Sequence, residues 1–107
     1  MALALARAGA PGLAWLDSAL AGPDGRWSVL AAWPDLALDT RPGDPDPLPE
    51  TARLLAATPE APGPMPSPHL LLTLGYDLGA RLDRFPWKAQ DDLTEHDLRL
   101  RRYPAVL

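Results

Sequence analysis

The 107-residue chain contains no cysteine. This absence excludes a disulfide framework, thiolate catalysis and cysteine-ligated metal sites, and it fits a cytoplasmic protein. Positive charge is also scarce, since ten lysines and arginines stand against fourteen aspartates and glutamates, for a net charge of −4. Nucleic acids and anionic membranes attract basic surfaces, so the acidic balance argues against both as partners. The short basic cluster of Arg99, Arg101 and Arg102 does not change that expectation.

Long hydrophobic runs are missing as well. No stretch approaches the ~20 apolar residues that a membrane-spanning helix needs. The apolar N-terminus does not fit a signal peptide, because it lacks a basic start and is interrupted by Arg7 and by Pro11-Gly12. We therefore expect no membrane partner.

Residues that could bind a metal or catalyse a reaction are few. The histidines, His69 and His96, show no metal-ligand spacing. The acidic run that contains Asp91, Asp92, Glu95 and Asp97 has neither the glycine nor the spacing of a calcium loop, so we expect a solvated loop or a helix cap. The sequence thus predicts no metal site and no catalytic residue in this chain.

Two serines suit ligand binding better than catalysis. Neither Ser18 nor Ser28 lies in a G-x-S-x-G turn, and no histidine is near either in sequence. Both lie close to a tryptophan, Trp15 or Trp27, and small-ligand pockets combine apolar walls with a few placed polar groups. A hydrogen-bonding role in a pocket is therefore the better hypothesis.

Proline is abundant, with fourteen residues against a usual share of about 5%. The prolines concentrate at 40–49 and 59–68, which we expect to be loops because proline lacks the amide hydrogen that helices and central strands use. Between them, residues 49–58 form a short helix candidate with Leu54 and Leu55 facing inward.

The remaining segments predict strands and turns. We expect a buried strand at 13–18, a turn at Pro23-Asp24-Gly25, a hairpin partner at 26–34, a short strand at 35–39, an apolar strand buried on both faces at 69–77, one or two helical turns after it, and an alternating strand from residue 96 with Leu98 and Leu100 on one face. These elements predict one α+β region over residues 1–107, with a partial, mostly antiparallel sheet and short helices.

The segment Gly75-Tyr76-Asp77-Leu78-Gly79 resembles a functional loop at first sight. It lacks the G-x-G-x-x-G spacing of a dinucleotide loop and the lysine of a phosphate loop. We expect a structural role instead. Gly75 and Gly79 would take positive-φ or close-packed positions, Tyr76 would lie in the core, and Asp77 would cap the next helical turn.

Two motifs in order resemble a known family. Leu16-Asp17-Ser18, followed by Gly25-Arg26-Trp27-Ser28, resembles the opening strands of the chorismate-utilising enzymes anthranilate synthase component I and, more closely, aminodeoxychorismate synthase component I. The stretch from "GYDLGARLD" to "DDLTEHDLRLRRY" resembles a later motif of the same family. The resemblance covers residues 13–39 and 69–107. It departs from the family pattern at Pro68, His69, Leu72 and Thr73, where glycines and a tyrosine are usual.

The resemblance implies a fold, a function and a site. The chain would be the N-terminal, non-catalytic portion of an aminodeoxychorismate synthase component I-like protein, which serves para-aminobenzoate and folate biosynthesis, and it would form part of that family's α/β sandwich. A tryptophan pocket is implied at Ser18, with Asp17, Arg26, Trp27 and Ser28 nearby. Gly75, Tyr76, Asp77 and Gly79 would form a structural motif.

The resemblance also implies partners. The chorismate-binding half, with its acid/base residues and its Mg²⁺-binding glutamates, has no counterpart in these 107 residues. We therefore expect no activity from the chain alone and no cofactor in it. The implied partners are a chorismate-binding domain, in the same or a separate chain, a glutamine amidotransferase subunit, and tryptophan as a ligand. The alternative is a stand-alone module that binds a small ligand or a partner without enzyme activity.

Overall fold

The structure is a computed structural model of the whole chain and describes residues 1–18, 22, 27–59, 70–83 and 94–106. Its elements are α1 (Ala2–Arg7), β1 (Ala14–Leu16), β2 (Val29–Ala31), β3 (Leu36–Thr40), α2 (Leu48–Ala57), β4 (Leu70–Leu74), the 3₁₀ helix η2 (Tyr76–Leu78), α3 (Gly79–Leu82) and β5 (Leu98–Arg102). The fold is α+β with antiparallel pairing, as expected. The expected turn at 23–25, His69, Asp91 and Asp92, and most of the loop at 59–68 lie outside the described residues.

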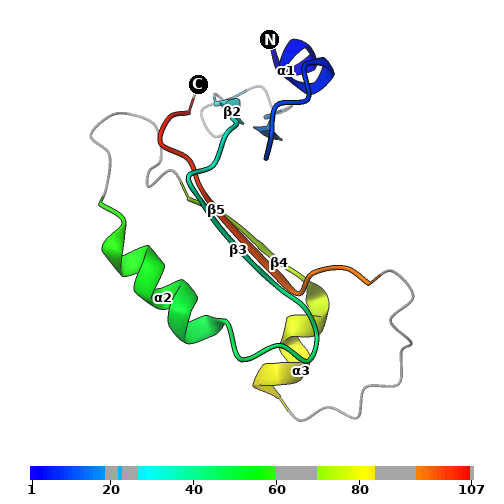
Figure 1. Cartoon of the computed structure of the whole chain (residues 1–107), viewed down its shortest axis with the longest axis vertical. Coiled ribbons are helices and arrows are strands. Elements are labelled where there is room, and N and C mark those ends of the chain that lie inside the picture. The colour runs from blue at the N-terminus through cyan, green and yellow to red at the C-terminus, as the bar shows by residue number, and fades with distance from the viewer. Residues whose placement is uncertain (19–21, 23–26, 60–69, 84–93, 107) are drawn as a thin grey trace.

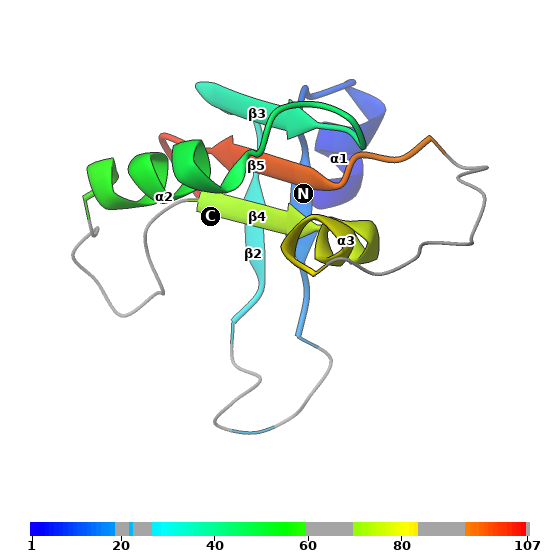
Figure 2. The same cartoon turned by 90° about the horizontal axis from the view of Figure 1, so that it is seen from below.

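A three-stranded antiparallel sheet forms the centre of the molecule. Its strand order is β3-β5-β4, so the last strand in sequence lies in the middle (Figure 2). The predicted alternation of β5 is confirmed, since Leu98 and Leu100 are fully buried while Arg99 is exposed. A strand whose alternate residues are leucine can bury one face and leave the other polar.

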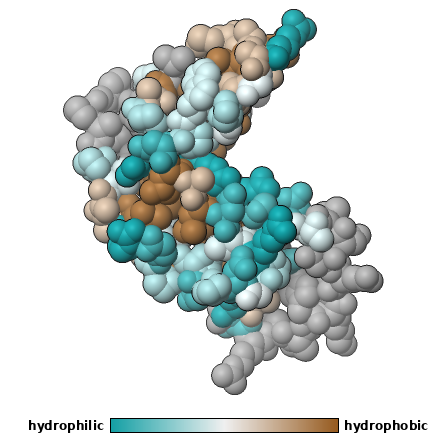
Figure 3. Space-filling model, viewed as in Figure 1, coloured by the Kyte–Doolittle hydropathy of each residue, from teal (hydrophilic) through white to brown (hydrophobic). Residues whose placement is uncertain are grey.

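Helix α2 lies along one face of this sheet (Figures 1 and 2). The buried core consists of Leu54, Leu78, Leu98 and Leu100, with the partly buried Leu36, Leu38, Leu48 and Leu70 packed against it. Figure 3 shows apolar side chains gathered between the helix and the sheet. The sequence prediction of this helix is confirmed, although it begins at Leu48.

Two predicted orientations are wrong. Leu54 is buried, but Leu55 is 41% exposed, because consecutive helix residues point about 100° apart and only one of them can face the sheet. The strand expected at 69–77 is β4, which ends at Leu74 and lies at the sheet edge rather than being buried on both faces. Leu72 is 36% and Leu74 is 55% exposed, since an edge strand lacks a neighbour on one side.

The expected hairpin is present but small. β1 pairs antiparallel with β2 through Ala14 and Ala31, Trp15 and Leu30, and Leu16 and Val29. The prediction that 13–18 is buried is wrong, because Trp15 is 59% and Leu16 is 52% exposed. A hairpin of this length cannot bury both of its faces.

Contacts near the end of β5 join the hairpin to the three-stranded sheet. Ala31 forms an isolated antiparallel bridge with Val106. The buried Tyr103 donates a hydrogen bond from its hydroxyl to the carbonyl of Gly12, at 2.8 Å. Burial raises the pKa of the Tyr103 hydroxyl, because the charged phenolate is disfavoured away from water.

In the described part of the chain, no helix has the length and apolar character needed to cross a bilayer.

Candidate ligand site at the first hairpin

The hairpin brings two of the predicted site residues together. Leu16 and Val29 form the last pair of the β1–β2 ladder, so the next residues, Asp17 and Ser28, face each other across the two strands. Ser28 Oγ donates a hydrogen bond to Asp17 Oδ1 at 2.5 Å. Both residues are exposed, so the carboxylate and the hydroxyl are open to a ligand as well as to each other.

For the other predicted site residues, the structure gives positions and exposures rather than contacts with Asp17 or Ser28. Ser18 follows Asp17 and is half-buried, and Trp27 precedes Ser28 and is 39% exposed. Arg26 lies outside the described residues. The described hairpin therefore offers an acidic and a hydroxyl group beside exposed indoles, which can bind an ammonium group and an aromatic surface.

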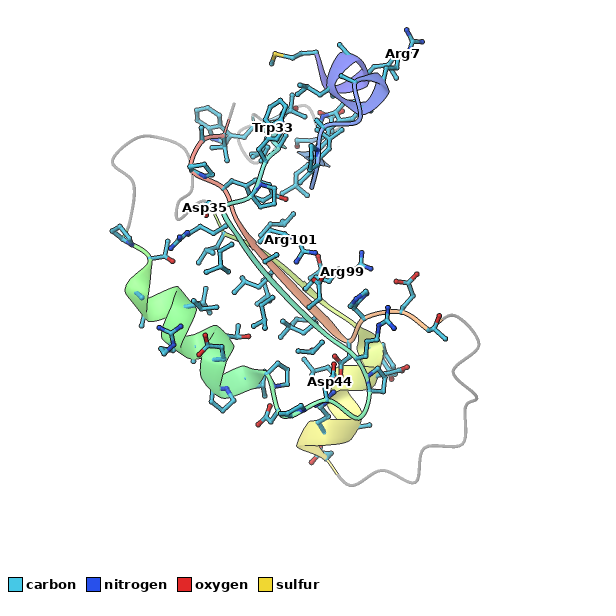
Figure 4. All side chains as sticks on the ribbon, viewed as in Figure 1. Arg7, Trp33, Asp35, Asp44, Arg99 and Arg101 are labelled. Atoms are coloured by element: carbon cyan, nitrogen blue, oxygen red, sulfur yellow. The ribbon has the colours of Figure 1, made fainter. Side chains whose placement is uncertain are left out.

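An apolar hollow lies on the same part of the molecule. It has a volume of about 240 Å³ and is lined by Leu5, Leu30, Ala31, Ala32, Trp33, Pro104 and Ala105. Trp33, labelled in Figure 4, has a left-handed φ of 56°, which is uncommon for a residue with a side chain. Its amide donates to the carbonyl of Pro11 at 2.9 Å. No sequence pattern indicates this hollow, because its walls come from three separate segments.

Of the two reasons expected for a glycine at position 75, close packing is confirmed and a positive φ is not. The φ of Gly75 is −71°, so the residue does not need glycine's left-handed freedom. A Cβ atom at Gly75 would lie 3.1 Å from Asp97 Cα and 3.1 Å from the His96 carbonyl oxygen. The Gly75 amide also donates to the Asp97 carbonyl at 2.8 Å. A side chain at this position would therefore press the backbone of His96 and Asp97 by a few tenths of an ångström, so glycine suits the close packing found here.

The predictions for the other three motif residues are wrong. Tyr76 is 90% exposed, because only one residue of the short η2 helix can face the core and Leu78 takes that place. Asp77 makes no capping hydrogen bond for η2 or α3. Gly79 has an ordinary helical φ of −56°, and a Cβ atom added there would meet no other atom within 4 Å, so neither expected reason for glycine applies.

The sequence patterns did not indicate a buried ion pair that the structure contains. Arg81 Nη2 lies 2.6 Å from Asp97 Oδ2, and the Asp97 side chain is only 2% exposed. Thr40 Oγ1 donates to the other carboxylate oxygen at 2.6 Å. Asp97 therefore does not belong to a solvated acidic loop. The available signal was its position directly before the buried alternation of Leu98 and Leu100.

Arg81 also binds the loop between β3 and α2. Its guanidinium donates to the carbonyl oxygens of Asp44, at 2.6 Å, of Pro45, at 3.2 Å, and of Arg41. One arginine thus connects α3, the residue before β5 and a proline-rich loop. The geometry describes a structural junction in which Arg81 and Gly75 bind neighbouring segments.

The arginines of β5, of which Arg99 and Arg101 are labelled in Figure 4, bind carboxylates. Arg101 binds Asp39 through two nitrogens, at 2.5 and 2.7 Å, and this hydrogen bonding holds the pKa of Asp39 below its ordinary value. Arg102 binds Asp35 at 2.9 and 3.1 Å and lowers the pKa of that carboxyl in the same way. Arg99 Nη2 lies 3.7 Å from Glu95 Oε2, which makes an ion pair four residues apart in the sequence. The basic cluster of the sequence is therefore neutralised locally.

The structure describes only one of the two histidines, His96, and only part of the acidic run. His96 is half-buried, and its Nδ1 lies 2.6 Å from Arg99 Nη2, which gives it a local structural contact. No group of metal-ligating side chains occurs among residues 1–18, 27–59, 70–83 and 94–106.

Comparison with protein-family models, with curated proteins and with solved structures finds no match for this chain.

Proposed function

We propose that the chain is the N-terminal, non-catalytic portion of an aminodeoxychorismate synthase component I-like protein. The observation that carries this proposal is the contact between Asp17 and Ser28. These residues belong to two separate sequence motifs, and the resemblance assigns both to one ligand site. The hairpin register, in which Leu16 pairs with Val29, supports the proposal because it brings Asp17 and Ser28 into contact.

The second motif supports the same proposal. Its two ends, Gly75 with Arg81 and the segment around Asp97, are joined by the backbone hydrogen bond at 2.8 Å and the ion pair at 2.6 Å. A chance match of a sequence pattern does not require its distant parts to bind each other. Their mutual contact is what a motif with a structural role produces.

The partner proposal follows from the half of the family pattern that these residues do not contain. The chorismate-binding domain would supply the acid/base residues and the Mg²⁺ site, and a glutamine amidotransferase subunit would supply ammonia. The cytoplasm, where folate biosynthesis takes place, is the proposed location. We propose tryptophan as the ligand of the hairpin, since an aspartate, a serine hydroxyl and exposed indoles can bind its ammonium and aromatic groups.

A reconstitution assay tests the activity. The chain alone, with chorismate, Mg²⁺ and ammonia, should give no turnover, and addition of a separately produced chorismate-binding half should restore it. Turnover by the chain alone at the rate of a full-length enzyme would contradict the proposal, and so would a chorismate-binding half that neither binds the chain nor gains activity from it.

Calorimetry with tryptophan tests the ligand. Binding should release or absorb heat and raise the melting temperature, because a ligand that binds only the folded state stabilises it. Ser28→Ala should weaken binding at least several-fold. Thr73→Ala, which removes a hydroxyl from an exposed position on β4, is the matched control and should leave the affinity unchanged.

The apolar hollow favours a second candidate, the stand-alone binding module. A cavity of about 240 Å³ with apolar walls, which include Trp33, can hold a small apolar group. This candidate gains support if the chain binds a ligand while the chorismate-binding half has no effect on it.

A further inference from the structure

We propose that the free edge of β4 pairs with β4 of a second copy of this chain, in an antiparallel register centred on Leu72. β4 lies at the end of the sheet order β3-β5-β4, and no other described strand lies next to it. Sheet edges expose unpaired N–H and C=O groups, which proteins usually protect with charged residues, proline or a bulge. The β4 sequence, Leu70–Leu74, contains no charge and no proline.

The hydrogen-bond register shows which residues face outward. The β4–β5 register ends at Leu74 and Leu98, and Gly75, the next residue, donates its amide to the carbonyl of Asp97. Extending the register by one position therefore makes Gly75 and Asp97 a hydrogen-bonded pair. Hydrogen-bonded and non-hydrogen-bonded pairs alternate along an antiparallel ladder, so Thr73 and Leu71 use their backbone groups toward β5. The N–H and C=O groups of Leu70, Leu72 and Leu74 therefore point to the free edge.

These outward residues are self-complementary. When Leu72 pairs with Leu72 of the second copy, Leu70 falls opposite Leu74 of that copy, and each such pair is of the hydrogen-bonded type. The opposed side chains are leucines, so no like charges meet despite the net charge of −4. The exposed surfaces of Leu72 and Leu74, at 36% and 55%, would be partly buried.

The size of the contact sets its strength. Five paired residues at about 3.4 Å each form a strip about 17 Å long. Such a strip buries less than the roughly 1,200 Å² total of a standard stable interface. The proposal is therefore a weak, concentration-dependent dimer rather than an obligate one.

Sedimentation of the full chain tests the dimer. The weight-average mass should rise toward twice the 11.5 kDa of one chain as the concentration increases from about 10 μM to about 1 mM. Leu72→Lys should abolish this rise, because it places like charges opposite each other. Leu55→Lys makes the same change at an exposed leucine of α2 and should preserve the rise.

Cross-linking tests the register. The chain has no cysteine, so Leu72→Cys introduces a single thiol in each copy. Opposed hydrogen-bonded residues have Cα atoms about 5.5 Å apart, within the range of a disulfide. Mild oxidation should cross-link Leu72→Cys at least tenfold faster than Leu55→Cys. Circular dichroism should first show that each variant folds like the parent chain.

Three results would overturn the proposal: a monomer at every concentration, a dimer that Leu72→Lys does not weaken, or equal cross-linking of the two cysteine variants. These measurements use neither chorismate nor tryptophan. Failure of the dimer therefore leaves the proposed function untouched, and failure of the reconstitution assay leaves the dimer untouched.

Discussion

Replacement of Arg81 by methionine should destabilise the fold strongly. The change removes the charge that binds Asp97 and leaves a carboxylate whose side chain is 2% exposed with Thr40 as its side-chain donor. Breaking a buried ion pair from one side typically costs about 3–5 kcal/mol, because the remaining charge stays buried without compensation. The Thr40 hydroxyl still donates to Asp97, so we expect about 3 kcal/mol, near the lower end of that range.

The reverse replacement should cost less. In Asp97→Asn, the guanidinium of Arg81, whose side chain is 19% exposed, keeps the carbonyl oxygens of Asp44 and Pro45 as acceptors. We expect a loss of about 1–2 kcal/mol, the usual cost of weakening one hydrogen-bonded contact to a charged group. The double variant should lose less than the sum of the two single losses, since the two side chains are in direct contact.

Urea unfolding measures these losses. At a slope of about 1.5 kcal/mol per molar urea, the midpoint of Arg81→Met should fall by roughly 2 M. Arg53→Met is the matched control, because Arg53 forms an ion pair of the same 2.6 Å length with Glu50 but is 63% exposed. It should shift the midpoint far less. Equal shifts for the two variants, or an additive double variant, would refute the reasoning.

Three further outcomes can be checked on the same chain. A hydrogen bond from Arg101 lowers the pKa of Asp39, so this interaction stabilises the fold fully above the ordinary pKa of 3.8 and is lost as the pH falls through the lowered pKa. Asp39→Asn should therefore flatten the acid limb of a curve of stability against pH. An unchanged acid limb would contradict this. Tyr103→Phe removes the hydrogen bond to Gly12 and should cost about 1 kcal/mol in thermal unfolding, whereas no loss would mean that the bond contributes nothing. Leu100→Ala should cost about 2–5 kcal/mol in urea unfolding, because Leu100 is fully buried, and a loss under about 1 kcal/mol would contradict the core assignment.

Local patterns predicted most elements of this fold, although not helix α1. The alternation of Leu98 and Leu100 with arginines indicated the strand and its buried face, and Pro49 in a first-turn position marked the helix that follows the first proline-rich loop. Such patterns depend on neighbours in sequence, which is why they can be interpreted without a structure.

Burial was harder to predict than secondary structure. Trp15, Leu55 and Tyr76 are all apolar or aromatic, and all were expected inside, yet each is exposed. Burial depends on whether a second layer covers a side chain, and α2 covers only one face of the central sheet. Composition gives no information on which hydrophobic residues will find such a layer.

At the candidate site, too, local sequence patterns predicted some contacts and not others. Asp17 and Ser28 could be assigned to one hairpin because the strands around them have clear turn signals, and the register then determines that they meet. Arg81 and Asp97 could not be paired in advance, since fifteen residues separate them in the sequence and many carboxylates were available as partners.

The position of that ion pair changes how the two motifs of the chain should be interpreted. Gly75 and Arg81 are bound to Asp97, so substitutions there act on the stability of the whole sheet before they can act on any ligand. Asp17 and Ser28 are exposed and lie on a small hairpin, so substitutions there can change binding with little effect on the core. A loss of partner activity after a change at Gly75 or Arg81 is therefore evidence about folding. Only a loss at Asp17 or Ser28, in a chain that still folds, is evidence about the proposed ligand site.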